Sequence, residues 1–299
     1  MKSINIICPV YNEEDCIEIF FDEIVKLKKK LQNYNLNLIF TNNDSEDKTY
    51  NICQKLCNEN EWVKLITFTR NFGYQASILC GLKHYEADYY SIVDVDLQDP
   101  PALIEKFLEI SEQEGYKIVF GNRSDREENF IIKNLRKVFY KIMKKFADQD
   151  FQVNMAEFFL ITNEVKKIIT NNKSTNIFLR NEVAYTGFKR KGVSFTRKKR
   201  IAGKGVGESF RYMITFAFSG LIASSTLPLR ISFYSFLPIT LLNLLGFFEI
   251  KIISSAILIM LNFIFIGYSL SFISIYIARM YKDIIGRPLY IIDNTKSIL

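Results

Sequence analysis

Histidine, tryptophan and paired cysteines are scarce in this sequence. The five cysteines are an odd number with no Cys-x-x-Cys spacing, which excludes a disulfide scaffold and predicts reduced core residues. His84, the single histidine, lies in a predicted helix, so acid–base chemistry falls to carboxylates. Charge is also missing from residues 231–278, which contain only Glu249 and Lys251. This run excludes a wholly soluble protein, and the ordinary charge content of the remainder excludes a polytopic transporter or a disordered chain.

The charge-poor run divides into two apolar segments, residues 231–250 and 252–278. Each is near the roughly 20 residues that a membrane-spanning helix needs. Two buried helices of a soluble core are the alternative, which the length of the second segment disfavours. Basic residues precede the first segment and follow the second, so the positive-inside rule predicts that both termini are cytoplasmic. The apolar stretch at residues 4–10 is too short for a signal peptide, and we expect residues 1–229 to stay in the cytosol.

Before that run, short β-rich stretches alternate with stretches of helical spacing. The predicted strands are residues 4–10, 36–41, 63–68 and 89–94, and the predicted helices are residues 13–31, 47–58 and 74–85. Repeated βα units of this length predict an α/β domain whose mostly parallel sheet is covered by helices on both faces. In such sheets ligands bind beyond the carboxyl ends of the strands, so polar residues at those ends are functional candidates.

Two aspartates and an amide follow the fourth predicted strand. Asp94 and Asp96 are two residues apart, and Gln98 comes two residues later. Clustered oxygen ligands at a strand end suit Mg²⁺ or Mn²⁺ that holds a diphosphate, where the ion neutralises developing negative charge. A solvated acidic turn is the alternative for this motif alone. The polar residues that follow the first two predicted strands favour the metal–diphosphate site.

Together these motifs resemble the family 2 glycosyltransferases that load a sugar onto polyprenyl phosphate. The resemblance rests on CPVYNEE at 8–14, TRNFG at 69–73, DVDLQDPP at 94–101, AGK at 202–204 and GRPLY at 286–290. Within that family the chain looks like the bactoprenol (undecaprenyl-phosphate) glucosyltransferases, relatives of dolichyl-phosphate mannose synthase. The likeness covers nearly the whole chain, with the motifs in the family's order.

The resemblance implies a domain order and a location. It implies a cytosolic GT-A catalytic domain at residues 1–206, an amphipathic juxtamembrane helix at 207–229 and a two-span transmembrane anchor at 230–299. The location would be the bacterial cytoplasmic membrane, with the catalytic domain in the cytosol. A second stretch, residues 131–146, has the pattern of a basic amphipathic helix that lies on the bilayer or packs on the sheet. The resemblance implies no nucleic-acid partner and leaves a homo-oligomer open.

The resemblance also implies roles for individual residues. Pro9, Tyr11, Glu13 and Asn43 would line the nucleotide pocket, Asp94, Asp96 and Gln98 would hold the metal and diphosphate, and Arg123 would face the phosphates or acceptor. The basic segment at 189–211, with Arg197, Arg200 and Lys204, would close over the diphosphate or attract the lipid phosphate; plain attraction to anionic headgroups is the alternative. The catalytic candidates are Asp96, Glu157 and Arg123. Glu157 is the candidate base, although an acceptor phosphate is already anionic and needs little deprotonation.

The sequence departs from the family pattern at two places. Asn42 and Asn43 stand where the family usually has paired aspartates, and Phe159 stands where it usually has arginine. An amide can hydrogen-bond a nucleobase but cannot act as a charged acceptor, so these positions leave the nucleotide preference open.

We therefore predict metal-dependent transfer of a sugar, with UDP-glucose favoured as donor, to undecaprenyl phosphate. The mechanism would be direct displacement with inversion at the anomeric carbon. UDP-N-acetylhexosamine or GDP-mannose as donor and a non-catalytic membrane scaffold are the alternatives. A processive polysaccharide synthase is disfavoured because the chain has no Gln-x-x-Arg-Trp motif. A sugar nucleotidyltransferase would need a glycine-rich N-terminal phosphate loop, which residues 9–14 do not form.

Overall fold

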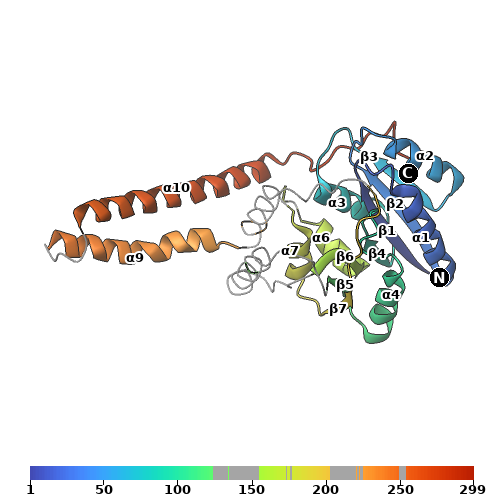
Figure 1. The fold of residues 1–299 in the computed structure, drawn as a ribbon, viewed down its shortest axis with the longest axis horizontal. Helices are drawn as coiled ribbons and strands as arrows, with labels where there is room; N and C mark the ends of the chain where they lie inside the picture. The colour runs from blue at the N-terminus through green and yellow to red at the C-terminus, as the bar shows by residue number, and fades with distance from the viewer. Residues whose placement is uncertain are drawn as a thin grey trace.

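The chain folds into an α/β domain from which two long helices extend together (Figure 1). This computed structural model describes residues 1–123, 134, 155–172, 174–175, 177–202, 220, 222, 225–248 and 254–299. The predicted amphipathic segment at 131–146 lies outside the described residues except for Asn134, as does most of the predicted juxtamembrane helix at 207–229. Lys204, one of the predicted substrate-binding residues, also lies outside them.

Seven strands form one mixed sheet in the order β3-β2-β1-β4-β6-β5-β7. They are β1 (Lys2–Val10), β2 (Tyr34–Asn42), β3 (Val63–Thr67), β4 (Tyr89–Ile92), β5 (Ile118–Arg123), β6 (Met155–Thr162) and β7 (Arg190–Phe195). The first four pair in parallel, β6 is antiparallel to both neighbours, and β7 is parallel to β5. Residues 4–10 of β1 are all buried, as expected for a strand with both faces covered. The predicted mostly parallel sheet is confirmed.

Helices cover both faces of this sheet. They are α1 (Ile17–Lys30), α2 (Thr49–Glu59), α3 (Tyr74–His84), α4 (Leu103–Glu114), α6 (Asn163–Thr170) and α7 (Leu179–Tyr185). Buried residues of α1, α2 and α4 share one core with Ile4 and Ile6 of β1, whereas those of α3, α6 and α7 share the other core with Ile7. The alternation of β1 side chains between the two cores is the period of a strand. All five cysteines are buried and free, as predicted.

The two long helices are α9 (Leu227–Phe247) and α10 (Ser255–Ile285), and both are long and apolar enough to cross a membrane. A reciprocal pair of hydrogen bonds joins the amides of Asn243 and Asn262, each 2.9 Å long, so the helices contact one another. The sequence analysis placed these segments at 231–250 and 252–278. Helix α10 continues seven residues beyond position 278. Its 31 residues make about 46 Å of helix, more than the roughly 30 Å apolar thickness of a bilayer.

The chain after α10 returns to the α/β domain and packs along the edge of the sheet. Ile298 bridges to Leu65 of β3, and Ile292 bridges to Phe68 just beyond it. The Tyr290 ring stacks on Phe68 with 5.3 Å between ring centroids. This contact covers backbone groups that the edge strand β3 would otherwise expose. It also ties the C-terminal end of α10 to the domain that carries the candidate site.

Candidate active site

A cavity of about 610 Å³ opens beyond the carboxyl ends of β1, β2 and β4. Most of the site residues predicted from the sequence line it: Pro9, Tyr11, Glu13, Asn43, Asp94, Asp96, Arg123, Glu157, Arg197 and Arg200. Gln98 does not line it. The parallel strands bring these residues together from distant parts of the chain because their carboxyl ends meet at one edge of the sheet.

The loops that follow β1, β2 and β4 each hold one non-glycine residue in the left-handed conformation. Asn12 has φ 54°, Asp44 has φ 61° and Leu97 has φ 55°. Such residues cost about 1–3 kcal/mol each and persist only where the surrounding structure holds them. Asn12 is held by its side-chain oxygen, which accepts a hydrogen bond from the Glu46 amide at 2.9 Å. The strain is therefore concentrated around the cavity.

Asp94 and Asp96 lie side by side in the cavity wall but have different partners. The Tyr74 hydroxyl donates a 2.7 Å hydrogen bond to Asp94. Burial, reinforced by the neighbouring Asp96 charge, raises the pKa of Asp94 to about 7. Asp96 Oδ1 accepts a 3.1 Å hydrogen bond from the Gln98 backbone amide, which shapes the turn. Gln98 thus contributes its backbone to the turn, whereas its predicted role was as a metal ligand.

Arg200 bridges two of the loops that surround the cavity. Its Nη1 lies 3.3 Å from Asp96 Oδ2, and its Nη2 forms an ion pair with Glu13. Burial raises the pKa of Glu13, and the Arg200 guanidinium opposes that rise. Arginine forms bidentate contacts with phosphate as readily as with carboxylate. The Arg200 guanidinium is therefore placed where a phosphate group could replace its carboxylate partners.

Arg123 is anchored by Asp99, a residue to which the sequence analysis gave no role. The Arg123 guanidinium lies 2.8 Å from Asp99 Oδ2, and the Asp99 side chain is only 2% exposed. Arg197 approaches the other Asp99 oxygen at 3.9 Å. Asp99 comes three residues after Asp96, so the DVDLQDPP motif supplies both a cavity carboxylate and the anchor for two cavity arginines.

Glu157 is held by a network of its own. Gln75 Nε2 donates to both carboxylate oxygens, at 3.1 and 2.9 Å, and Arg180 Nε lies 3.3 Å from one of them. The Gln75 side-chain oxygen in turn accepts a 2.9 Å hydrogen bond from the Leu179 amide. Glu157 thereby links α3, β6 and the start of α7. The sequence analysis named neither Gln75 nor Arg180, because no local pattern marks residues that meet Glu157 from 82 positions before it and 23 positions after it.

The comparison with known families fits this geometry. The sequence model of the family described as "Glycosyl transferase family 2" matches residues 5–188, which is more than half of the chain. The chain is a family 2 glycosyltransferase. The sequence resemblance is thereby confirmed, and so is the prediction of an enzyme.

Three relatives match this glycosyltransferase over nearly its whole length. An uncharacterized glycosyltransferase of Bacillus subtilis is 30% identical over 307 residues, which cover 98% of this chain and 94% of the relative. The bactoprenol glucosyl transferase of Shigella phage SfV is 30% identical over 312 residues, covering 98% and 99%. A prophage bactoprenol glucosyl transferase homolog of Escherichia coli is 29% identical over 313 residues, also covering 98% and 99%.

The positions that depart from the usual family pattern have structural partners in this glycosyltransferase. Asn43 donates to the Asn71 side chain at 2.8 Å and accepts from the Phe72 amide at 2.8 Å, so it fixes the loop after β3. Asn42 accepts a 2.6 Å hydrogen bond from the Ser45 hydroxyl. Both amides therefore shape the loops around the cavity. Asn43 reaches the cavity wall as well, where it was predicted to bind substrate.

The oxygen ligands that this glycosyltransferase offers fit a divalent metal ion that is also bound by a substrate. Within the described residues no cluster of three or more histidine, cysteine, aspartate or glutamate side chains could hold an ion by itself. Asp94 and Asp96 are hard oxygen donors beside cationic side chains. Mg²⁺ is typically bound by one or two carboxylates together with substrate phosphates and water. The two aspartates match that pattern, with the remaining ligands left to a diphosphate.

Proposed function

We propose that this glycosyltransferase transfers glucose from UDP-glucose to undecaprenyl phosphate. The observation that carries the proposal is the cavity in which Asp94 and Asp96 lie beside the guanidinium of Arg200. Carboxylates beside arginine suit a metal-bound diphosphate. The bactoprenol glucosyl transferases among the relatives support glucose as the sugar and a polyprenyl phosphate as the acceptor.

Each cavity residue then has a task in the reaction. Asp94 and Asp96 would hold Mg²⁺ or Mn²⁺, which when bound would supply positive charge to the leaving diphosphate. Arg200 would exchange its carboxylate partners for the donor diphosphate, and Arg123, held by Asp99, would present its guanidinium to the phosphates. Pro9 and Tyr11 would line the nucleotide end of the cavity.

The bond changes need no covalent enzyme intermediate. An oxygen of the acceptor phosphate attacks the anomeric carbon while the bond from that carbon to the diphosphate oxygen breaks, so UDP leaves and the anomeric configuration inverts. The attacking phosphate is already an anion at neutral pH and needs no general base. Glu157 therefore acts as a positioning residue, because Gln75 and Arg180 engage its carboxylate.

The membrane helices give this reaction its location. We infer that α9 and α10 anchor the enzyme in the bacterial cytoplasmic membrane with the catalytic domain in the cytosol, since basic residues flank both helices. A lipid acceptor keeps its phosphate at the membrane surface. An enzyme that uses it needs an active site held beside the bilayer.

Incubation of the full-length protein with undecaprenyl phosphate, Mn²⁺ or Mg²⁺ and a panel of UDP- and GDP-sugars tests this function. We expect a glucosylated lipid from UDP-glucose, and none from the Asp96→Ala variant. The control Asp22→Ala, which removes an exposed carboxylate of α1, should remain active. Turnover with a different sugar nucleotide would replace UDP-glucose as the assigned donor. Turnover that survives Asp96→Ala would overturn the metal assignment. The absence of glycolipid with every donor would favour a membrane scaffold.

A further inference from the structure

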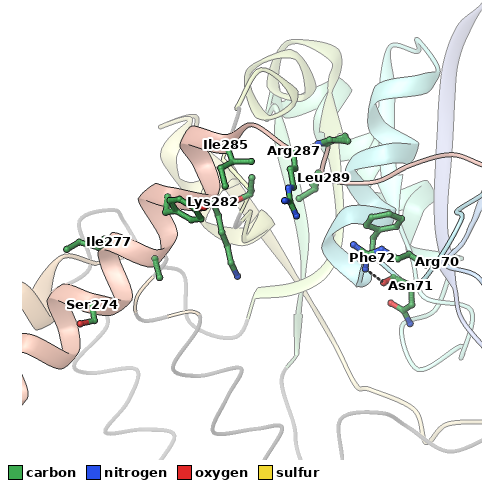
Figure 2. A pocket seen from close by; sticks show the side chains of 13 residues that line it. Arg70, Asn71, Phe72, Ser274, Ile277, Lys282, Ile285, Arg287 and Leu289 are labelled. Atoms are coloured by element: carbon green, nitrogen blue, oxygen red, sulfur yellow. Dashed lines mark hydrogen bonds between the residues drawn. The ribbon is translucent and has the colours of Figure 1, made fainter.

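A second cavity lies where the cytosolic end of α10 approaches the loop after β3, and Figure 2 shows it from close by. Its volume is about 940 Å³. We call it the juxtamembrane groove and define it by Arg70, Ile277, Lys282, Ile285 and Arg287, with Asn71 at its inner end. Asn71 lines both this groove and the catalytic cavity. The two cavities are therefore neighbours that share a wall.

Three cations line the juxtamembrane groove. Arg70 comes from the loop after β3, Lys282 from the last turns of α10 and Arg287 from the segment after it. All three side chains are exposed, and in the described part of the chain none lies within ion-pair distance of an acidic group. In Figure 2 the Lys282 and Arg287 side chains extend toward the same side of the ribbon. The groove therefore offers concentrated positive charge that no described side chain neutralises.

The nearby acid, Asp283, is already engaged. Its carboxylate accepts a hydrogen bond from the Thr175 amide at 2.7 Å and another from the Thr175 hydroxyl at 2.6 Å. These bonds fix the end of α10 to the segment before α7, while the chain beyond Arg287 is fixed to the sheet edge by Tyr290. The positions of the groove cations are thus set by contacts on both sides of them.

An apolar wall accompanies the three cations. Ile277 is 58% exposed and Ile285 is 42% exposed, and both face the groove from α10. The same helix continues toward the apolar segment that could cross a membrane. A ligand that carries a phosphate on a hydrocarbon chain would match both parts of the groove at once, with its phosphate at the cations and its chain along the helix.

We propose that the juxtamembrane groove binds the phosphate end of the polyprenyl-phosphate acceptor, an inference that rests on the proposed function. Arg70, Lys282 and Arg287 surround the phosphate, and Ile277 and Ile285 contact the first isoprene units. A phosphomonoester carries more negative charge than the phosphodiester of an ordinary phospholipid, and a site with three cations favours it. From this groove the phosphate reaches the donor past Asn71.

This assignment differs from the expectation that residues 189–211 attract the lipid phosphate. Arg197 and Arg200 approach Asp99, Asp96 and Glu13 inside the catalytic cavity. They are therefore placed to serve the donor diphosphate. The groove cations lie at the C-terminal end of α10 and beside it.

Lipid binding and turnover, measured separately on the full-length protein, test the proposal. Native mass spectrometry in detergent would count retained undecaprenyl phosphate, with undecaprenol and phosphatidylglycerol as comparison lipids. The variants are Arg70→Gln, Lys282→Gln and Arg287→Gln, with Arg287→Lys as the conservative change. The matched control is Arg230→Gln, which removes a cation near the start of α9 and outside the groove.

We expect each glutamine variant to weaken undecaprenyl-phosphate binding and raise its KM by about tenfold, the effect of losing one charge-assisted hydrogen bond. The KM for UDP-glucose should change less than about twofold, and Arg287→Lys should recover part of the loss. Arg230→Gln should bind and turn over as the unmodified protein does. Phosphatidylglycerol should not compete with undecaprenyl phosphate.

Other outcomes separate this proposal from the function on which it rests. Transfer that is unaffected by all three glutamine variants would overturn the groove assignment and leave the proposed function standing. Equal losses in Arg230→Gln and in the groove variants, or effective competition by phosphatidylglycerol, would indicate general headgroup attraction and also overturn it. Lipid retention that depends on the three cations without any transfer would support the groove and refute the proposed function.

Discussion

Replacing Gln75 with leucine should destabilise the catalytic domain by about 3–5 kcal/mol. Gln75 donates to both oxygens of Glu157, at 3.1 and 2.9 Å, and accepts from the Leu179 amide at 2.9 Å. A hydrogen bond to a charged group contributes about 1.5–3 kcal/mol, and a buried amide left without a partner costs about 1–3 kcal/mol. Glu157 is 7% exposed at the cavity wall, and Leu179 is fully buried, so its backbone amide has no ready replacement for the lost partner.

The single tryptophan provides the assay for this prediction. Trp62 stacks on Phe21 with 5.5 Å between ring centroids, so its fluorescence reports unfolding of the catalytic domain without a tryptophan signal from α9 or α10. Denaturant titration in detergent would compare Gln75→Leu with Gln54→Leu. Gln54 makes one 3.0 Å hydrogen bond, to the Tyr50 hydroxyl on the same helix, and its loss should cost less than about 1 kcal/mol. If the two variants are equally stable, the network around Glu157 does not carry the stability assigned to it.

Three further predictions concern Glu157, the α9–α10 hairpin and the metal. Glu157→Gln should lower kcat less than about tenfold and keep the acidic limb of the pH–rate profile; a hundredfold loss with that limb removed would make Glu157 the base. Asn243→Leu should weaken α9–α10 association by about 0.6–2 kcal/mol in steric trapping, because it leaves the Asn262 amide without its partner. The double variant that also carries Asn262→Leu should recover part of this loss. If the single and double variants lose the same amount of association free energy, the amide pair is refuted. Because the pKa of Asp94 is raised to about 7, calorimetric Mn²⁺ affinity should rise with pH from about 6 to 8 as the proton is lost, and a flat profile would contradict this.

Local sequence patterns were sufficient to predict the strands and helices of the first half of the sheet. The strand predicted at residues 63–68 is Val63–Thr67 in the structure, and the helix predicted at 74–85 is Tyr74–His84. Apolar runs and helical spacing mark these elements because each buries a face that its own residues define. The residues that follow the strands could then be grouped at one edge of the sheet, which is why most predicted site residues line one cavity.

Long-range contacts account for what the sequence did not reveal. The antiparallel insertion of β6 between β4 and β5 and the return of residues 290–298 to the edge at β3 depend on partners far away in the sequence. The same holds for the Glu157 network and for the pairing of Asp99 with Arg123. The end of α10 was also missed, because the helix runs beyond the apolar residues that mark a candidate span and carries Lys282 to the groove.

The configuration of the product tests the central claim most directly. Full-length protein in nanodiscs would be given UDP-glucose, in which glucose is α-linked, together with undecaprenyl phosphate and Mn²⁺, and the glycolipid would be analysed by NMR. The account predicts a β-linked glucosyl phosphate, formed by one displacement, and no product when the metal is chelated. An α-linked product, a covalent sugar–enzyme intermediate or undiminished turnover without metal would contradict it.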